Sequence, residues 1–482
     1  MKVLFINPPA LNELLGNNPS IIESERGFNP PLGLLLLAGY LLDRNPSHSV
    51  TVIDAQVERL TYAQLEQRLK TLDFDVAGMT AMTFTMLDVK ETARILKQVN
   101  PGCQVVLGGP HVNLFPQETI RMPDVDVLVL GEGEILFSHL LDHMDDPEKL
   151  REFKGLVFKD ANGRIIHTGD PEIISEAVLN TLPFPARQLT PYRQYSSLLA
   201  KRTPVTTMFT SRGCPFRCSF CNRPHLGKTF RALRPERVVA EMKACLELGI
   251  HEFLIYDDTF TVRKDRVMEI CRLIIREKLD IGFDIRARVD TLDDDMLDML
   301  KKAGCRGIHY GIEAGTPKIL KVLNKGIDLN QAKRIMDATK KRKMQTLAYF
   351  MIGAPTETRA DIETTFDTAK WLNPDFVHLT ILTPFPGTPL YLDGLSTGMI
   401  QRDYWKEFAE NLNPDFKPPH WDEIFPRETL EQLIVDGYKR FYVRPLYIIK
   451  KLFSIRSFGE LKRKAVAGLK VLVMKKRSHP KE

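Results

Sequence analysis

Three cysteines in one short stretch have the type and the spacing that metal chemistry requires. Cys214, Cys218 and Cys221 form the pattern C-x3-C-x2-C. Three thiolates on one loop can hold three irons of a four-iron cluster, which leaves the fourth iron open to bind a small molecule. A closed structural site needs a fourth protein ligand, and the zinc alternative would recruit His225. The other cysteines are isolated and are predicted to be small core residues: Cys103, Cys245, Cys271 and Cys305.

Strands that alternate with helices must position this loop. Six strand–helix repeats predict a parallel barrel, or a partial (β/α)6 TIM-type barrel. The cysteines directly follow the first predicted strand, so they are expected at the carboxyl ends of the strands, where barrel active sites form. The predicted strands are 206–211, 252–257, 282–288, 307–312, 344–352 and 376–382.

A second alternation precedes the barrel. Residues 1–145 hold five strand–helix units, which predict an α/β, doubly wound (Rossmann-like) sheet with ligands at the carboxyl ends of its strands. Small residues gather at two of those ends, around Gly108-Gly109 and Glu132, and glycine lets a backbone approach a bulky ligand closely. The predicted strands are 2–7, 50–54, 75–80, 104–107 and 126–130.

Two boundary features divide the chain. Residues 155–169 are predicted to form a hairpin, and prolines concentrate at 182–192. The alternation stops beyond residue 400, where 402–453 is predicted to form a small helical cap. The predicted organisation is a first domain at 1–150, a hairpin and linker at 151–199, a barrel at 200–400, and a helical cap with a basic tail at 401–482.

The net charge of +6 originates at one end of the chain. Residues 438–482 contain 14 Lys/Arg and 2 Asp/Glu, which leaves 53 Lys/Arg and 59 Asp/Glu in the remainder. In this tail Leu461, Ala465, Leu469 and Leu472 recur at helical spacing among cations, as in helices that lie on anionic membranes. Nucleic-acid binding is not expected, because no RNA-binding module accompanies the cations. A solvated terminus is the remaining alternative.

No stretch of the sequence predicts a membrane span. The longest uncharged apolar run, residues 29–42, holds 14 residues, whereas a span needs about 20. No secretory signal precedes the first predicted strand. We therefore expect a cytoplasmic protein that can contact the inner face of the cell membrane peripherally through its basic tail.

The cysteine pattern in its barrel context resembles the signature of the radical SAM superfamily. Gly311-Ile312-Glu313 resembles the family's GIE segment, which helps to bind S-adenosylmethionine (SAM), and Phe220 resembles the aromatic residue that shields the cluster. The resemblance implies a 4Fe-4S cluster on the three cysteines, and cleavage of SAM to a 5′-deoxyadenosyl radical. It also implies an electron donor such as flavodoxin or ferredoxin.

Three more residues at predicted strand ends are candidates for SAM binding: Asp258, Arg288 and Gly353. The structural alternatives are a helix-capping role for Asp258, a surface salt bridge for Arg288 and a simple turn at Gly353.

The domain before the barrel resembles that of the cobalamin-binding subclass. The segments NPP, PPLGLLLLAGYL, GGPH and GEGE carry this likeness, and it implies cobalamin as a further cofactor. The subclass motif D-x-H-x-x-G is absent, so the lower face of cobalt is expected to be empty, water-bound or met by another side chain. The alternative is a vestigial domain. The candidates for lining the corrin are Thr80, Met82, Gly108, Gly109 and Glu132.

These resemblances imply an oxygen-sensitive radical SAM enzyme. The expected reaction is cobalamin-dependent methylation of an unactivated carbon on a hydrophobic, lipid-like or other small-molecule substrate. The alternative within the subclass is an oxidative cyclase, similar to the anaerobic magnesium-protoporphyrin monomethyl ester cyclase. A tRNA methylthiotransferase is disfavoured because only Cys103 is present in the first domain, where that family carries three cluster cysteines. A non-catalytic cobalamin-binding protein is disfavoured by the intact cysteine and GIE motifs.

Overall fold

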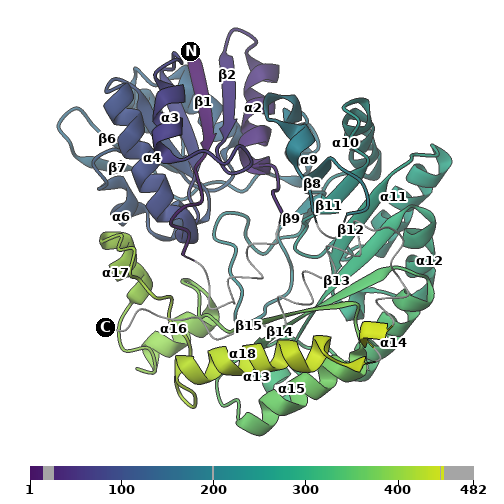
Figure 1. Ribbon diagram of the computed structural model, residues 1–482. Helices are drawn as coiled ribbons and strands as arrows, with labels where there is room; N and C mark the ends of the chain where they lie inside the picture. The colour runs from purple at the N-terminus through teal and green to yellow at the C-terminus, as the bar shows by residue number, and fades with distance from the viewer. Residues whose placement is uncertain (15–26, 198–199, 446, 450–482) are drawn as a thin grey trace.

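The protein folds into two α/β units followed by a helical segment (Figure 1). The computed structural model describes residues 1–14, 27–197, 200–445 and 447–449. The predicted amphipathic stretch at 461–477 lies outside these residues. No helix in the described part of the chain combines the length and the apolar character that a membrane crossing requires.

The first unit contains the predicted doubly wound sheet. Its parallel strands lie in the order β2-β1-β3-β4-β5. Because successive side chains of a strand point to opposite faces, Phe5 packs with α2 and α7 on one face, while Leu4 packs with α3 and α4 on the other. The strands are β1 (Lys2–Asn7), β2 (Ser49–Asp54), β3 (Val76–Thr80), β4 (Gln104–Gly108) and β5 (Val127–Val129). The helices are α2 (Leu32–Arg44), α3 (Tyr62–Leu69), α4 (Met86–Val99), α5 (Pro110–Leu114), α6 (Pro116–Ile120), α7 (Gly133–Asp142) and α8 (Pro147–Leu150).

The predicted hairpin is present, but it extends the sheet of the first unit. Its strands, β6 (Leu156–Lys159) and β7 (Ile165–His167), are antiparallel, and β6 pairs with β5. Leu156 and Val157 are fully buried on opposite faces of the sheet. The hairpin therefore covers the open edge of β5, and it packs as part of the first sheet and not as part of a linker. The segment between the two units carries the short helix α9 (Glu176–Leu179).

The second unit is a partial barrel of six parallel strands in the order β8-β11-β12-β13-β14-β15, with each strand beside its predecessor. This confirms the predicted (β/α)6 arrangement. The strands are β8 (Val205–Met208), β11 (Glu252–Ile255), β12 (Gly282–Ala287), β13 (Cys305–Glu313), β14 (Gln345–Ile352) and β15 (Phe376–Ile381). The outer helices are α10 (Pro235–Glu247), α11 (Lys264–Arg276), α12 (Asp294–Lys302), α13 (Pro317–Val322), α14 (Leu329–Lys341) and α15 (Arg359–Leu372).

The helices predicted beyond residue 400 are present, and they pack against the two α/β units. The longest of them, α18 (Arg427–Tyr442), packs on β15 and α15 (Figure 1). The hydroxyl of Tyr438 accepts from the Leu379 amide and donates to its carbonyl, and the hydroxyl of Tyr442 does the same at Val377. Because β15 ends the sheet, two tyrosines satisfy main-chain groups that a further strand would otherwise pair. The shorter helices are α16 (Pro389–Ser396) and α17 (Tyr404–Glu410), and α17 contacts α6 of the first unit.

A buried ion network joins the two units. Arg212 lies in the short strand β9 (Ser211–Arg212), which pairs with β10 (Arg231–Ala232), so two arginines are direct cross-strand neighbours. Glu132 of the first unit binds Arg212 at 2.7 Å and Arg231 at 2.6 Å, and Glu134 also binds Arg212. Burial works against ionisation of Glu134, but the charge of Arg212 outweighs it and lowers the pKa of that carboxyl. The network therefore stays charged inside the protein.

We expect Arg212→Met to destabilise the protein by about 3–5 kcal/mol, because it leaves the buried Glu134 without its ion-pair partner and removes one of the two arginines that bind Glu132. The measurement is the free energy of unfolding from denaturant titration. The matched control is Arg94→Met, which breaks the exposed pair with Glu91 and should cost less than about 1 kcal/mol. Equal losses in the two variants would contradict the structural role of the network.

Candidate functional site

The cysteine loop begins where strand β8 ends, at the carboxyl side of the barrel. The predicted first strand stops early because the buried Asp257 carboxylate accepts from the amides of Thr210, at 2.6 Å, and Ser211, at 3.1 Å. Asp257 also accepts from both hydroxyls, each at 2.6 Å. Gly213 has a φ of +76°, and a Cβ there would lie 2.2 Å from the Thr229 carbonyl oxygen, so only glycine fits.

The loop presents three free thiols. Cys214 is buried, whereas Cys218 and Cys221 are half-buried. Burial raises the pKa of the Cys221 thiol to about 11, the charge of Arg223 opposes this shift, and the neighbouring Cys218 and Cys214 add to it. Three thiols on one loop, close enough to affect each other's charge, fit the donor set of a three-cysteine iron–sulfur site.

Two arginines flank these sulfurs. Arg223 binds the carboxylate of Asp258 at 2.5 Å, so Asp258 closes the cysteine loop and does not serve as the predicted alternative helix cap. Arg288 lies with its Nη1 at 4.0 Å from the sulfur of Cys218 and its guanidinium 3.9 Å from the ring centre of Phe216. The same guanidinium is buried, which excludes the surface salt bridge considered above.

Arg288 is also fixed by oxygen partners. Its Nε and Nη2 donate to the carboxylate of Asp290 at 3.0 and 2.8 Å, and Nη2 donates to the carbonyl of Lys325 at 2.7 Å. These bonds hold the planar guanidinium in one orientation beside the cysteine loop. Phe220 packs against a cluster of buried apolar residues below the loop that follows β13.

The GIE segment forms the end of β13 around a bulge. The pairing of β13 with β14 shifts between Gly311 and Glu313, and Glu313 has a φ of +74°. The Glu313 carboxylate binds the ammonium of Lys325 at 2.8 Å, and both side chains are buried. A Cβ on Gly311 would lie 2.4 Å from that carboxylate, so glycine makes room for the pair. Glu313 is thus placed to hold an ammonium group.

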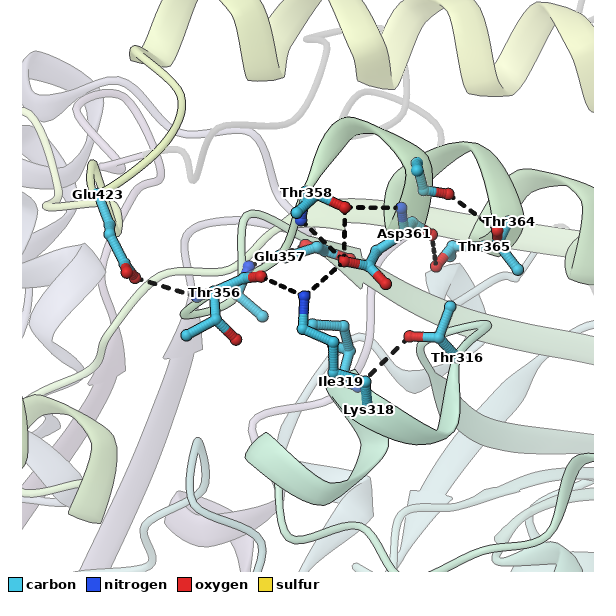
Figure 2. Close-up of polar contacts among 12 residues, drawn as sticks. Thr316, Lys318, Ile319, Thr356, Glu357, Thr358, Asp361, Thr364, Thr365 and Glu423 are labelled. Atoms are coloured by element: carbon cyan, nitrogen blue, oxygen red, sulfur yellow. Dashed lines mark hydrogen bonds and ion pairs between the residues drawn. The ribbon is translucent and has the colours of Figure 1, made fainter.

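Gly353 begins a loop that a polar network holds in place (Figure 2). The buried Glu357 accepts from the amides of Gly353, at 2.6 Å, and Ala354, at 2.9 Å. Lys318 then joins the Thr356 carbonyl, at 2.6 Å, to the Asp361 carboxylate, at 2.8 Å. Gly353 has a φ of +84°, so the turn expected there is present and glycine relieves its strain.

In the first unit, four of the five predicted corrin-lining residues lie together at the carboxyl ends of β3 and β4. Thr80 pairs with Gly108, and a Cβ on Gly109 would lie 2.8 Å from the Thr80 side chain. A Cβ on Gly108 would meet only the Val129 carbonyl, at an ordinary 3.5 Å, so packing does not demand glycine there. Met82 is 46% exposed. An open surface with two glycines beside an accessible thioether fits the approach of a bulky apolar ring.

The prediction for Glu132 was wrong. Its side chain is only 1% exposed, and both carboxylate oxygens are taken by Arg212 and Arg231. The amide of Ile174 donates to it as well, at 2.9 Å. Glu132 therefore joins the two units and does not line a ligand surface.

His111, in the GGPH segment, is buried beside Thr83. Its Nδ1 lies 3.1 Å from the Thr83 hydroxyl, and burial lowers its pKa to about 3. The imidazole is therefore neutral at pH 7, and it packs against the ring of Phe115.

Sequence reasoning missed three residues of the site: Asp257, Arg223 and Lys325. Asp257 is the first residue of an Asp-Asp pair, of which only the second was singled out. Lys325 stands between Asn324 and Gly326, which both have positive φ, so the local signal was that of a turn. The two neighbours with left-handed backbone conformation direct the Lys325 side chain toward Glu313, and the spacing of residues in the sequence does not reveal this contact.

The structure thus places three free thiols at the carboxyl side of a partial barrel that a buried ion network joins to a doubly wound sheet, as in an enzyme with an iron–sulfur centre. The model of the Radical SAM superfamily matches residues 208–369, and that of the B12 binding domain matches residues 21–141. The chain is 34% identical to an uncharacterized methyltransferase of Pyrococcus horikoshii, over 97% of this chain and 98% of the relative. The chain therefore belongs to the radical SAM enzymes that carry a B12-binding domain. Its cofactors are a 4Fe-4S cluster, SAM and cobalamin.

Further relatives have different reactions. The chain is 28% identical to the anaerobic magnesium-protoporphyrin IX monomethyl ester cyclase of Rubrivivax gelatinosus, over 93% of this chain and 78% of that protein. It is 26% identical to the hopanoid C-3 methylase of Methylococcus capsulatus, over 78% of this chain and 70% of that protein. The fold is also that of the cobalamin-dependent SAM radical enzyme OxsB, with a TM-score of 0.73 at 17% identity, covering 98% of this chain and 72% of that one.

The Glu357 carboxyl gives a pH prediction. Burial raises its pKa from 4.5 to about 7, although two backbone amides oppose the shift. A raised native pKa favours the protonated folded state, so this contribution is full below pH 4.5 and is lost as the pH rises through about 7. Between pH 4.5 and 8, the wild type should lose about 3 kcal/mol of stability relative to Glu357→Gln.

The measurement is the free energy of unfolding of both proteins across this pH range. Glu247→Gln removes the same charge from an exposed position on α10 and serves as the control. Parallel pH curves for the wild type and Glu357→Gln would show that Glu357 is ionised at no cost.

Proposed function

We propose that this enzyme is a cobalamin-dependent radical SAM methyltransferase that methylates an unactivated carbon of a hydrophobic, lipid-like or other small molecule. The observation that carries the proposal is the buried network of Arg212 with Glu132 and Glu134. The network joins Arg212, which precedes the cysteine loop, to the start of α7, which follows the carboxyl end of β5. The two ligand faces are thereby held toward each other, as one reaction that uses two cofactors requires.

When bound, the cluster and SAM supply a hydrogen-abstracting radical and cobalamin supplies a methyl group. The protein's part is to bind, orient and shield. In this proposal Cys214, Cys218 and Cys221 hold the cluster. The SAM-binding residues are Phe220, Asp258, Arg288, Gly311, Glu313 and Gly353, and the corrin-lining residues are Thr80, Met82, Gly108 and Gly109. Glu313 supports this assignment because it already binds one ammonium, that of Lys325.

The second candidate is oxidative cyclisation or another C–H functionalisation without methyl transfer. The match to the cyclase over 93% of this chain favours it. The two candidates share every cofactor, so only the fate of the methyl group of SAM separates them. An electron donor such as flavodoxin or ferredoxin is proposed for both, because cluster reduction must precede SAM cleavage.

The proposal is tested by anaerobic reconstitution with iron, sulfide and hydroxocobalamin. We expect about four irons per chain from one 4Fe-4S cluster and about one cobalt per chain from one cobalamin. The reconstituted enzyme should form 5′-deoxyadenosine only when a reductant is present. Incubation with SAM labelled in its methyl group should then label the product of a hydrophobic substrate library. The variant with Cys214, Cys218 and Cys221 all replaced by Ala should form no deoxyadenosine. Deoxyadenosine without methyl labelling would support the cyclase alternative, and deoxyadenosine from the triple variant would contradict the cluster assignment.

We further propose that the basic tail contacts the inner face of the cell membrane. Near an anionic surface each cation contributes about 1 kcal/mol. Deletion of residues 455–482 should therefore weaken cosedimentation with vesicles of anionic phospholipid, and added salt should reduce the difference. Vesicles of neutral phosphatidylcholine are the control. Unchanged binding of the shortened protein to anionic vesicles would contradict a membrane role.

A further inference from the structure

The inside of the barrel carries a row of polar side chains below the cysteine loop. The row comprises Tyr256, which directly follows β11, and Arg286, His309, Tyr349 and His378, which lie in β12, β13, β14 and β15. These strands lie side by side in Figure 1. Arg286 is the register partner of His309, and Tyr349 is the partner of His378. Between β13 and β14, His309 pairs with Leu347 and Gly311 pairs with Tyr349, so Tyr349 and His378 lie two residues further along the strands than Arg286 and His309.

These side chains face the barrel interior because their sequence neighbours face outward. Ile285, Ile308, Tyr310, Phe350 and Leu379 are buried in the core between the strands and the outer helices. Successive residues of a strand point to opposite faces, so the intervening residues point inward. All five members of the row are half-buried, and none is sealed in the core.

Arg286 is the one arginine among these five side chains, and the contacts of the row fix its surroundings. The guanidinium of Arg286 lies 4.1 Å from the ring centre of Tyr256. His309 Nδ1 lies 3.1 Å from the hydroxyl of Tyr349, whose ring meets that of His378 edge to face at 5.6 Å. Burial lowers the pKa of His309 to about 4, and the charge of Arg286 adds to this, so His309 is neutral at pH 7.

Arg286 has no carboxylate partner in residues 1–14, 27–197, 200–445 and 447–449. The nearby arginines do have one, since Arg288 binds Asp290 and Arg306 binds Glu252. The acidic residues of adjoining levels are engaged elsewhere: Asp258 with Arg223 and Glu313 with Lys325. An uncompensated guanidinium in a half-buried position is costly unless an anion binds it.

One further carboxyl faces the same interior from the level below. Asp284 lies two residues before Arg286 on β12, and burial raises its pKa to about 7, with Glu252 adding to the shift. Arg306 and Lys201 lower the pKa in part, so these two cations are the ones that face it. Asp284 is therefore only partly ionised at neutral pH, and none of the ion pairs among the described residues joins it to Arg286.

We infer that the barrel interior holds a binding site for the carboxylate group of the substrate, and that Arg286 is the residue that binds it. The guanidinium fork matches a carboxylate in two parallel hydrogen bonds. The single guanidinium of Arg286 beside the neutral imidazole of His309 suits a monoanion better than a phosphate dianion. The inference deepens the proposed function, on which it rests, by giving its hydrophobic substrate one acidic group.

The position of Arg286 explains why a carboxylate there would be useful. Arg286 lies in β12, and Arg288, two residues later and just beyond the strand's end at Ala287, reaches the sulfur of Cys218. Two residues span roughly 6.6 Å of a strand. A substrate held by its acid group at Arg286 thus extends past the cysteine loop, so that an aliphatic carbon several bonds from the acid lies at the level of the loop. Binding energy from a remote group would fix the position of that carbon.

The test measures binding and does not need turnover. The probes are hexanoate, its neutral methyl ester and hexyl phosphate, titrated calorimetrically into reconstituted holoenzyme with SAM present. We expect the wild type to bind hexanoate most tightly of the three. Arg286→Gln should weaken hexanoate binding about tenfold to a hundredfold, as expected for loss of charged hydrogen bonds. It should leave the binding of the ester nearly unchanged.

Two further variants keep the inference falsifiable. Arg286→Lys retains the charge but loses the fork, so it should bind hexanoate with intermediate affinity. Arg334→Gln removes an exposed arginine from α14 on the outside of the barrel and should bind like the wild type. Circular dichroism and thermal unfolding identify any variant that does not fold.

Equal affinity of the wild type and Arg286→Gln for hexanoate, or tighter binding of hexyl phosphate, would overturn the inference. Failure of the proposed function would look different, because the wild type would then form no deoxyadenosine while it still bound hexanoate.

Discussion

The arrangement of the whole site depends on one buried guanidinium. Arg212 stands two residues before the first cluster cysteine, and its two carboxylate partners begin a helix of the other unit. Neither charge can be buried alone, because the loss of hydration exceeds what the protein would return without the opposite partner. The units must therefore meet in the one relation that pairs these charges. Arg231, directly across the strand pair, binds the same Glu132 and adds a second constraint on that relation.

Four arginines near the cysteine loop show how the same side chain can serve different ends. Arg212 joins the units, Arg223 closes the loop through Asp258, and Arg288 is clamped by Asp290 and the Lys325 carbonyl beside Cys218. Each of these three arginines forms an ion pair with a carboxylate. Arg286 differs because, among the described residues, it rests on the aromatic face of Tyr256 and pairs with no carboxylate. Arg286 near the end of β12 and Arg288 just beyond it thus provide one receptive and one satisfied cation two residues apart.

Local signals made much of this protein predictable. The cysteine spacing, the GIE segment and the regular alternation of strands and helices depend on neighbours in the sequence, so both sheets and the cysteine loop could be derived. Long-range partners could not. Glu132 sits in a glycine-rich turn typical of a ligand site, yet two arginines 80 and 99 residues away claim it. For the same reason the sequence did not reveal Lys325, whose ammonium binds Glu313 at the end of β13. Nor did it reveal the packing of α18, because α18 covers a sheet edge that exists only once the barrel strands have assembled.

The two tyrosines of α18 have a consequence for how the protein behaves in a crowded solution. An unpaired terminal strand is a template on which another chain can add its own, and a six-stranded open barrel would offer such a template at β15. Tyr438 and Tyr442 occupy the amides and carbonyls of Leu379 and Val377, so a foreign strand would have to displace both phenols before it could pair with these residues. The helix α18 thus protects the last strand of an unclosed barrel from polymerisation by strand addition.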